Sequence, residues 1–389
     1  MNAPFNPATG TLPWFNHDHE MLRDTIRRFV AERVLPHGDA WEESGFVPRD
    51  VLREMGELGL LGIRFDPRHG GSGLDTLASV VLAEELARST YGGFAITVLV
   101  HTDMAAPHLV HAGTPAQQDR WMPDIAAGRK IAAVAMTEPD AGSDLASMRT
   151  TARREGGHWV LNGAKLYITN GVHGDIYFVA AKTGEPGRNH QVSMFVVEKG
   201  APGFSVARPL KKQGWLSSDT AELSFQDCRI PAENLLGEEN RGFHALVKNL
   251  QNERIVLGAQ AMGEAAKAIE ITLDWVRNRK AFGGALWDKQ AIRHKLAQRA
   301  AQVAAVQALI YQTAWRDAQG QECAREVSMI KALAGTLVNE VLYDCLQLHG
   351  GMGYIRESPI ERMARDARVQ AIGGGATEVM LEEVAKRLA

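Results

Sequence analysis

One carboxylate interrupts an apolar helical stripe in the second half of the chain. Phe243, Leu246, Leu250 and Leu257 recur at steps of three, four and seven, the spacing of one face of a helix, and Glu253 stands where another apolar residue is expected. A carboxylate in apolar surroundings loses hydration, which raises its pKa towards the range useful to a general base. Many such glutamates only pair with an arginine, so the pattern makes Glu253 a candidate base and nothing more.

The elements that position this carboxylate follow from changes in pattern along the 389 residues. Helical spacing dominates up to about residue 130, short β-rich runs parted by Gly, Asn, Asp and Pro follow, and helical spacing returns after Asn240. We therefore expect an α+β fold that is mostly α. Its predicted parts are an N-terminal helical domain (1–130), a middle β-barrel-like domain (131–240) and a C-terminal antiparallel helix bundle (241–389).

More local patterns predict individual elements. Asn162-Gly163 lies between the β-rich runs HWVL and KLYIT, and Asn-Gly favours a two-residue hairpin turn, so a hairpin is expected there. In the C-terminal part, helices are expected at about 242–277, 287–316, 322–349 and 378–388.

Composition and missing motifs exclude several classes of protein. A formal charge of -3 provides no basic field for nucleic acid, and no run of about 18 apolar residues predicts a membrane span. Cys228, Cys323 and Cys345 are too scattered for a disulfide framework or a zinc site, so we expect no metal. The first 20 residues lack the pattern of a secretory signal, and a cytoplasmic location is expected. Neither a Rossmann nor a P-loop fingerprint is present.

Two longer segments resemble the signatures of the acyl-CoA dehydrogenase family of flavoproteins. The first is AMTEPDAGSDLAS at 135–147, and the second is QLHGGMGY at 347–354, continuing through Glu357 and Arg362 to Asp366. The two segments stand in the family's order. The resemblance extends over nearly the whole chain, from about Asp18.

The resemblance implies that the chain binds FAD and an acyl-CoA thioester. The positions that match flavin-ring contacts are Val134, Met136 and Tyr167, those that match hydrogen bonds to the flavin and the CoA side of the substrate are Thr137 and Ser143, and Thr169 matches a hydroxyl near flavin N5. Further cofactor positions are Gly142, Thr377 and Glu378, and further substrate positions are Leu250, Arg254 and Gly373. Ala376 stands where most members have a threonine that contacts FAD, and neighbouring Thr377 is a possible replacement.

A separate set of residues resembles the segments that reach the FAD of a neighbouring subunit. These residues are Arg279, Phe282, Leu286, Gln290, Gln347 and Gly351. If FAD is shared in this way, at least a dimer is required, and the resemblance implies a homotetramer.

The resemblance also implies where the catalytic base lies. In the commonest branch the base occurs in a pattern like I-Y-E-G-T, but here 372–378 reads IGGGATE, so Gly374 occupies that position. Isovaleryl-CoA and long-chain dehydrogenases supply the base from L-x-x-E-R-[LI] on the first long bundle helix. The matching stretch here is LQNERI, in which Glu253 falls on the base. The backbone N–H of Gly374 keeps the family's role of donor to the thioester oxygen.

The expected reaction is α,β-dehydrogenation of an acyl-CoA to a trans-2-enoyl-CoA, with Glu253 removing the α-proton and flavin N5 accepting the β-hydride. Electrons are expected to pass to an electron-transferring flavoprotein. Three glycines at 373–375 leave room for a branched or medium- to long-chain acyl group. The alternatives are an acyl-CoA oxidase or flavin monooxygenase on the same scaffold, and a catalytically silent relative that acts as a binding protein.

Overall fold

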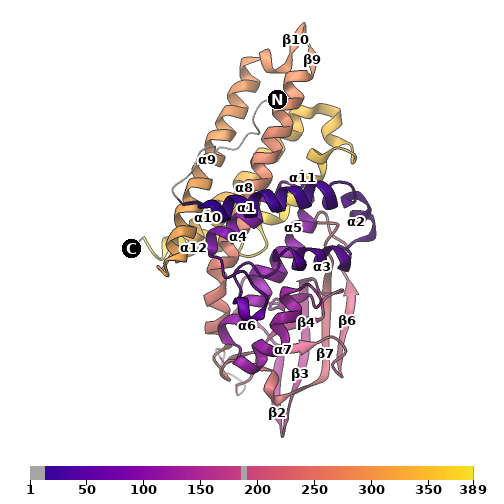
Figure 1. The fold of residues 1–389 in the computed structure, drawn as a ribbon, viewed down its shortest axis with the longest axis vertical. Helices are drawn as coiled ribbons and strands as arrows, with labels where there is room; N and C mark the ends of the chain where they lie inside the picture. The colour runs from indigo at the N-terminus through magenta and orange to yellow at the C-terminus, as the bar shows by residue number, and fades with distance from the viewer. Residues whose placement is uncertain (1–13, 185–190, 389) are drawn as a thin grey trace.

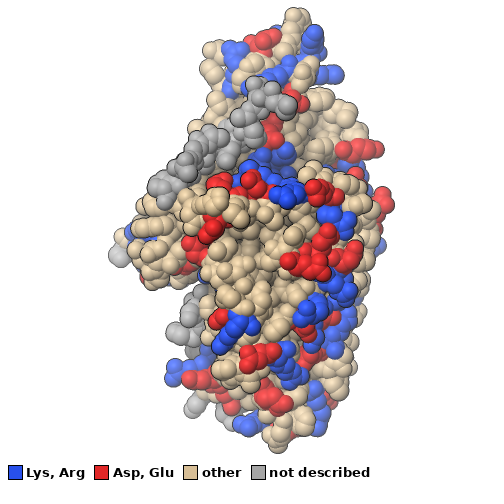
Figure 2. Space-filling view, viewed as in Figure 1, with Lys and Arg blue, Asp and Glu red and all other residues tan. Residues whose placement is uncertain are grey.

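The computed structural model describes residues 14–184 and 191–388, with the side chains of 243–248 left out. The molecule is elongated, with the strands at one end and the long C-terminal helices reaching towards the other (Figure 1). Its mostly helical α+β composition confirms the expected fold class. Over one face, acidic and basic side chains are interspersed (Figure 2).

Helices form the described chain before the sheet, as the helical spacing predicts. They are α1 (His17–Phe29), η1 (Val30–Val34), α2 (Gly38–Ser44), α3 (Arg49–Glu57), η2 (Pro67–His69), α4 (Thr76–Ala87), α5 (Gly92–Leu99), η3 (Val100–Ala105), α6 (Ala106–Ala112) and α7 (Pro115–Ala126). Helices α4 and α5 are buried on all sides, in keeping with their nearly uncharged sequence. The π-helical turn η3 joins α5 to α6 and lies beside the first strand and α8.

The strands form one open sheet and not a barrel, so that part of the fold prediction was wrong. The strand order is β6-β7-β3-β2-β4-β5-β8, with β1 paired to β4. The strands are β1 (Ala132–Ala135), β2 (Thr151–Glu155), β3 (His158–Thr169), β4 (Ile176–Lys182), β5 (Val192–Glu198), β6 (Phe204–Pro209), β7 (Thr220–Pro231) and β8 (Leu235–Leu236). Apolar side chains on one sheet face pack with α6 and α7. Closure into a barrel depends on pairing between the first and last strands, which strand patterns along the chain do not specify.

The predicted hairpin at Asn162-Gly163 is also wrong. Strand β3 runs straight through both residues, and its register with β7 shifts between Leu161 and Gly163. Asn162 bonds across the bulge to Asp227, donating from Nδ2 at 3.1 Å and accepting from the Asp227 N–H at 2.8 Å. The Asn-Gly pair therefore marks an irregularity inside a strand, which uses the same backbone freedom as a turn.

The C-terminal part packs long helices against each other and against the first domain. They are α8 (Gly242–Asn278), α9 (Gln290–Ala318), α10 (Ala324–His349), α11 (Pro359–Ala367) and α12 (Thr377–Ala385), with the small hairpin of β9 (Lys280–Ala281) and β10 (Gly284–Ala285) at one extremity. Helix α11 was not predicted from the sequence. One continuous apolar core joins α1 and α4 to α8, α9 and α10. Helices α8 and α9 therefore both contact α4 of the first domain.

Candidate active site

Glu253 lies on α8 and is 5% exposed. The sequence stripe therefore predicted its burial correctly, although the side chains of Phe243 and Leu246 lie outside the described residues. Burial raises the pKa of Glu253 to about 7, against a smaller lowering by the hydrogen bond from Asn249 and by the nearby charge of Arg254. A carboxyl with a pKa near neutrality is divided between its two protonation states at physiological pH, as a general base requires.

The hydrogen-bond donor to this carboxylate comes from one helical turn earlier. Asn249 Nδ2 lies 2.9 Å from Glu253 Oε1 and also donates to the main-chain oxygens of Asp103 and Met104, each at 3.1 Å. Asn252 Nδ2 lies 3.0 Å from the same Asp103 oxygen, and its own carbonyl accepts from Arg64. Two asparagines thus join α8 to η3 beside the candidate base.

Gly374 sits in a turn held against the same helix. Its φ of +68° lies in the left-handed region, and a Cβ built on it would come within 2.3 Å of Leu257 Cδ1. Leu257 is four residues after Glu253 on α8, so the turn lies close to the candidate base. The same close packing opposes any side chain at position 374.

A buried lysine joins the two ends of this turn. Lys331 Nζ, from α10, donates to the main-chain oxygens of Gln370 at 2.6 Å and Gly375 at 3.0 Å. Burial, together with the nearby charge of Arg254, lowers the pKa of Lys331 to about 8. Lys331 thus fixes the turn that presents the Gly374 N–H. Within the part of the chain that the structure describes, that N–H has no intramolecular acceptor.

The residues predicted to contact the flavin ring meet where β1 ends beside β3. The Leu166 N–H donates to the Thr137 oxygen at 2.9 Å, and the Thr137 hydroxyl donates back to the Leu166 carbonyl. Val134 and Met136 are half-buried beside this contact. Tyr167 is 68% exposed at a bulge with φ +63°. Thr169, two positions later on β3, pairs with Thr220 of β7.

This surface suits the flavin ring that the resemblance implies. A non-glycine residue held at positive φ with its aromatic ring turned out of the sheet is strained, and such strain is concentrated at ligand sites. The turn that follows β1 is fixed by Glu138, which accepts from the Thr150 N–H at 3.0 Å and from Lys165 Nζ at 2.8 Å. Glu138 therefore shapes the loop.

The remaining predicted residues near the turn and loop have simpler surroundings. Gly142 and Ser143 are exposed in the loop after β1, and Glu378 is exposed in the first turn of α12. The Thr377 hydroxyl donates to the Ala371 carbonyl at 3.4 Å. Leu250, Arg254 and Gly373 are half-buried, and the buried Nε of Arg254 has no partner among the described groups.

The set predicted to reach another subunit lies at the opposite end of α8 from the base. Arg279 follows Glu253 by 26 positions in the sequence, which corresponds to about 39 Å of helix at roughly 1.5 Å per residue. Phe282 and Leu286 lie at the hairpin β9–β10, Gln290 opens α9, and Gln347 and Gly351 lie where α10 ends (Figure 1). The structure does not bring this set together with Glu253 within one chain.

Three residues around the candidate base were missed from the sequence: Asn249, Asp103 and Lys331. Asn249 carries a readable signal, because it lies one turn before Glu253 on the same face. Lys331 sits inside the apolar run MIKALAG, where a charge signals a buried partner. Asp103 acts through its main-chain oxygen, which no side-chain pattern reveals.

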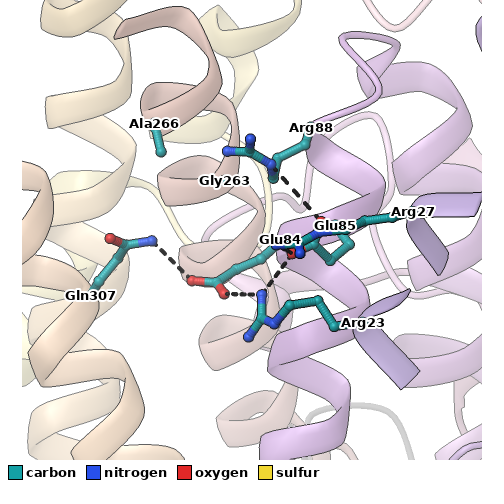
Figure 3. A pocket seen from close by; sticks show the side chains of 8 residues that line it. All are labelled: Arg23, Arg27, Glu84, Glu85, Arg88, Gly263, Ala266 and Gln307. Carbon is teal, nitrogen blue, oxygen red and sulfur yellow. Dashed lines mark hydrogen bonds and ion pairs between the residues drawn. The ribbon is translucent and has the colours of Figure 1, made fainter. Parts of the chain in front are cut away.

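A separate charged cluster lines a small cavity between α1, α4, α8 and α9, away from these residues (Figure 3). Its volume is about 10 Å³, roughly the space for one water molecule. Arg23 Nη1 lies 2.6 Å from Glu85 Oε1 and 3.7 Å from Glu84 Oε2, and Tyr311 donates to Glu84 at 2.6 Å. Charges paired so completely indicate a structural joint between helices, not a ligand site.

Comparison with known families assigns nearly the whole chain from residue 16 onwards. Residues 16–129, 133–228 and 240–389 match the models of the N-terminal, middle and C-terminal domains of acyl-CoA dehydrogenases. The chain belongs to the acyl-CoA dehydrogenase family. Members of this family are FAD-dependent oxidoreductases, so FAD is the cofactor and dehydrogenation of an acyl-CoA is the reaction class.

Relatives of this acyl-CoA dehydrogenase include both branches that the sequence resembled. The mitochondrial long-chain specific acyl-CoA dehydrogenase of Mus musculus is 41% identical over 376 residues, covering 96% of this chain and 87% of its own length. The mitochondrial isovaleryl-CoA dehydrogenase of Pongo abelii is 34% identical over 377 residues, covering 96% and 89%. The crystal structure of a probable acyl-CoA dehydrogenase from Mycobacterium abscessus superposes with a TM-score of 0.94 at 41% identity, covering 97% and 100%.

None of the helices in residues 14–184 and 191–388 of this acyl-CoA dehydrogenase is long and apolar enough to cross a membrane.

Proposed function

We propose that Glu253 is the base that removes the α-proton of an acyl-CoA thioester, and that the Gly374 N–H donates to the thioester oxygen as negative charge develops there. The observation that carries this proposal is the neutral-range, buried carboxylate of Glu253 beside Leu257, which contacts the Gly374 turn. A base and an oxyanion donor on adjacent elements meet the two needs of enolate formation. Bound FAD supplies the acceptor for the hydride that leaves the β-carbon, and the product is a trans-2-enoyl-CoA.

The residues that would hold FAD support a shared site. Val134, Met136, Thr137, Tyr167 and Thr169 form one surface, whereas the set around Phe282 and Gln347 lies at the far end of α8. Within one chain, about 39 Å of helix separates this second set from Glu253, the proposed base beside the flavin. We therefore infer at least a dimer, with a homotetramer as the family's usual state, in which each FAD contacts two subunits.

The substrate is proposed to carry a branched or medium- to long-chain acyl group. Residues 373–375 are all glycine, which removes side-chain bulk beside the turn, and the relatives at 41% and 34% identity are named for long-chain and isovaleryl substrates. A panel of acyl-CoA thioesters assayed with an artificial acceptor tests this assignment. Faster turnover of butyryl-CoA than of isovaleryl-, citronellyl- and palmitoyl-CoA would contradict it. The proposed electron acceptor is an electron-transferring flavoprotein, and rapid reoxidation by air with peroxide release would instead indicate an oxidase.

Replacement of the base gives the direct test. We expect Glu253→Gln to bind FAD normally but to slow anaerobic bleaching of its visible absorption by a good thioester by about 10²–10⁴-fold. Glu264→Gln is a matched control, because Glu264 is a second fully buried carboxyl on α8 with its pKa raised by burial to about 8. It should bleach at nearly the rate of the unaltered protein. Full bleaching by Glu253→Gln would refute the assignment of the base.

A further inference from the structure

We propose that Asn249 is a positioning residue for the reaction, fixing the Glu253 carboxylate so that Oε2 is the oxygen that takes the proton. This inference rests on the proposed role of Glu253 and adds the group that orients it. Asn249 is 1% exposed, and its Nδ2 is the described donor to Glu253 Oε1, at 2.9 Å. Oε2 accepts no hydrogen bond from the described residues and is not fully enclosed.

The orientation of the Asn249 amide is determined by its surroundings. Nδ2 faces three oxygens, namely the main-chain carbonyls of Asp103 and Met104 and Oε1 of Glu253. Rotating the amide by 180° would place Oδ1 against all three oxygens and would remove the donor that Asn249 gives to each of them. Oδ1 itself is buried and has no partner among the described residues. The observed orientation leaves Oδ1 without a hydrogen bond but keeps the three contacts of Nδ2.

The local sequence of the first domain explains why these carbonyls are available. Pro107 has no N–H, so the Asp103 carbonyl lacks the helical donor that would normally come from four residues later. The π-helical turn η3 at Val100–Ala105 further disrupts the regular ladder, and such turns are frequent at functional sites. The Asp103 oxygen accepts from Asn249 and from Asn252 of α8. The irregular backbone of η3 thereby provides an acceptor for Asn249, which in turn bonds the proposed base on α8.

Charged groups around Glu253 also shift its pKa, in addition to the hydrogen bond from the Asn249 amide. Arg254 on the same helix lowers the pKa of Glu253, and the Asp103 carboxylate on η3 raises it. Other charged groups nearby are Arg64, which bonds Asn252, and Lys331 on α10. Glu383 on α12 and Arg387, two residues after that helix, act on Arg254. The Asn249 hydrogen bond stabilises the ionised form directly, and it also holds Oε1 still.

Asn252 provides a matched control. It is buried on the same helix, carries the same amide and bonds the same Asp103 oxygen at 3.0 Å, but no hydrogen bond among the described residues joins it to Glu253. A loss of α8 anchoring alone should therefore affect Asn249 and Asn252 variants alike. A loss of carboxylate positioning should affect only the Asn249 variants.

The test is the pH dependence of anaerobic flavin reduction in Asn249→Leu and Asn252→Leu holoenzymes. We expect Asn249→Leu to move the acidic limb to higher pH by about one unit, the size of a lost hydrogen bond to a charged group, and to lower the limiting rate about tenfold. The dissociation constant of the thioester should change less than about twofold. Asn252→Leu should leave the limb in place, even if its thermal stability falls.

A direct readout of the carboxyl separates positioning from general damage. The infrared band of the protonated Glu253 carboxyl, identified by its absence in Glu253→Gln, should titrate at higher pH in Asn249→Leu than in the unaltered protein. If Asn249→Leu does not fold, Asn249→Ala, which leaves space for a water at the two carbonyls, is measured in the same way. An unmoved limb and band in the Asn249 variant, or an equal shift in the Asn252 variant, would overturn the inference. Bleaching retained by Glu253→Gln would instead overturn the proposed base.

Discussion

Two buried carboxyls where α8 packs against α11 make the protein's stability depend on pH. Burial, with the nearby charge of Asp366, raises the pKa of Glu264 to about 8, and burial raises that of Asp366 to about 7. The folded pKa values exceed the unfolded ones, so the folded state holds extra protons between about pH 4.5 and 8. The free energy of unfolding therefore falls as pH rises through that window. We expect the melting temperature to decline over this window and Glu264→Gln to flatten the decline. Calorimetry from about pH 5 to 9 measures both slopes, and parallel curves for the two proteins would contradict the expectation.

At the same scale, the sequence predicts some residues of the site better than others. The burial of Glu253, the proposed base, was predicted because an acid in an apolar stripe is visible without any partner. Asn249 and Lys331 act through main-chain oxygens that are far away in the chain, at Asp103 and Gln370. Periodicity carries no information about such contacts, because a carbonyl is the same in every residue.

At the scale of elements, the Gly373–Gly375 turn depends on its buried lysine. Lys331→Met keeps the aliphatic stem but removes donors to the Gln370 and Gly375 carbonyls, so the turn should lose its fixed position and the Gly374 N–H its alignment. We expect flavin reduction to slow by about 10–100-fold, the order of magnitude of a misplaced oxyanion donor. Stopped-flow reduction with a good thioester measures the loss.

Leu333, which follows Lys331 closely on α10, offers a surface control because it is 50% exposed. Leu333→Met introduces the same side chain on the same helix without touching the turn, so it should leave the reduction rate unchanged. Equal rates for Lys331→Met and Leu333→Met, with both proteins folded, would show that the turn is held by other contacts.

The positions and lengths of the long helices follow closely from apolar spacing, whereas the irregular elements and the short helix α11 do not. The long helix predicted at about 242–277 ends one residue later, at Asn278, while the Asn-Gly hairpin and the barrel were wrong. A helix satisfies its backbone hydrogen bonds internally, so its sequence alone specifies it. A strand bonds to neighbours chosen by the whole fold, so the same Asn-Gly pair serves as a turn in one context and a bulge in another.

On the scale of the whole molecule, the β9–β10 hairpin at the end of α8 exposes an aromatic side chain. Phe282 is 92% exposed with φ +52°, an arrangement that places a large aromatic ring in solvent at a cost in backbone strain. In the proposed assembly this ring is covered by the neighbouring subunit and its FAD. We expect Phe282→Asp to shift sedimentation towards smaller species and to lower FAD content at purification by more than half. Met21→Asp, at an apolar position 56% exposed on α1, should change neither, and an unaltered assembly with full flavin in Phe282→Asp would count against the shared site.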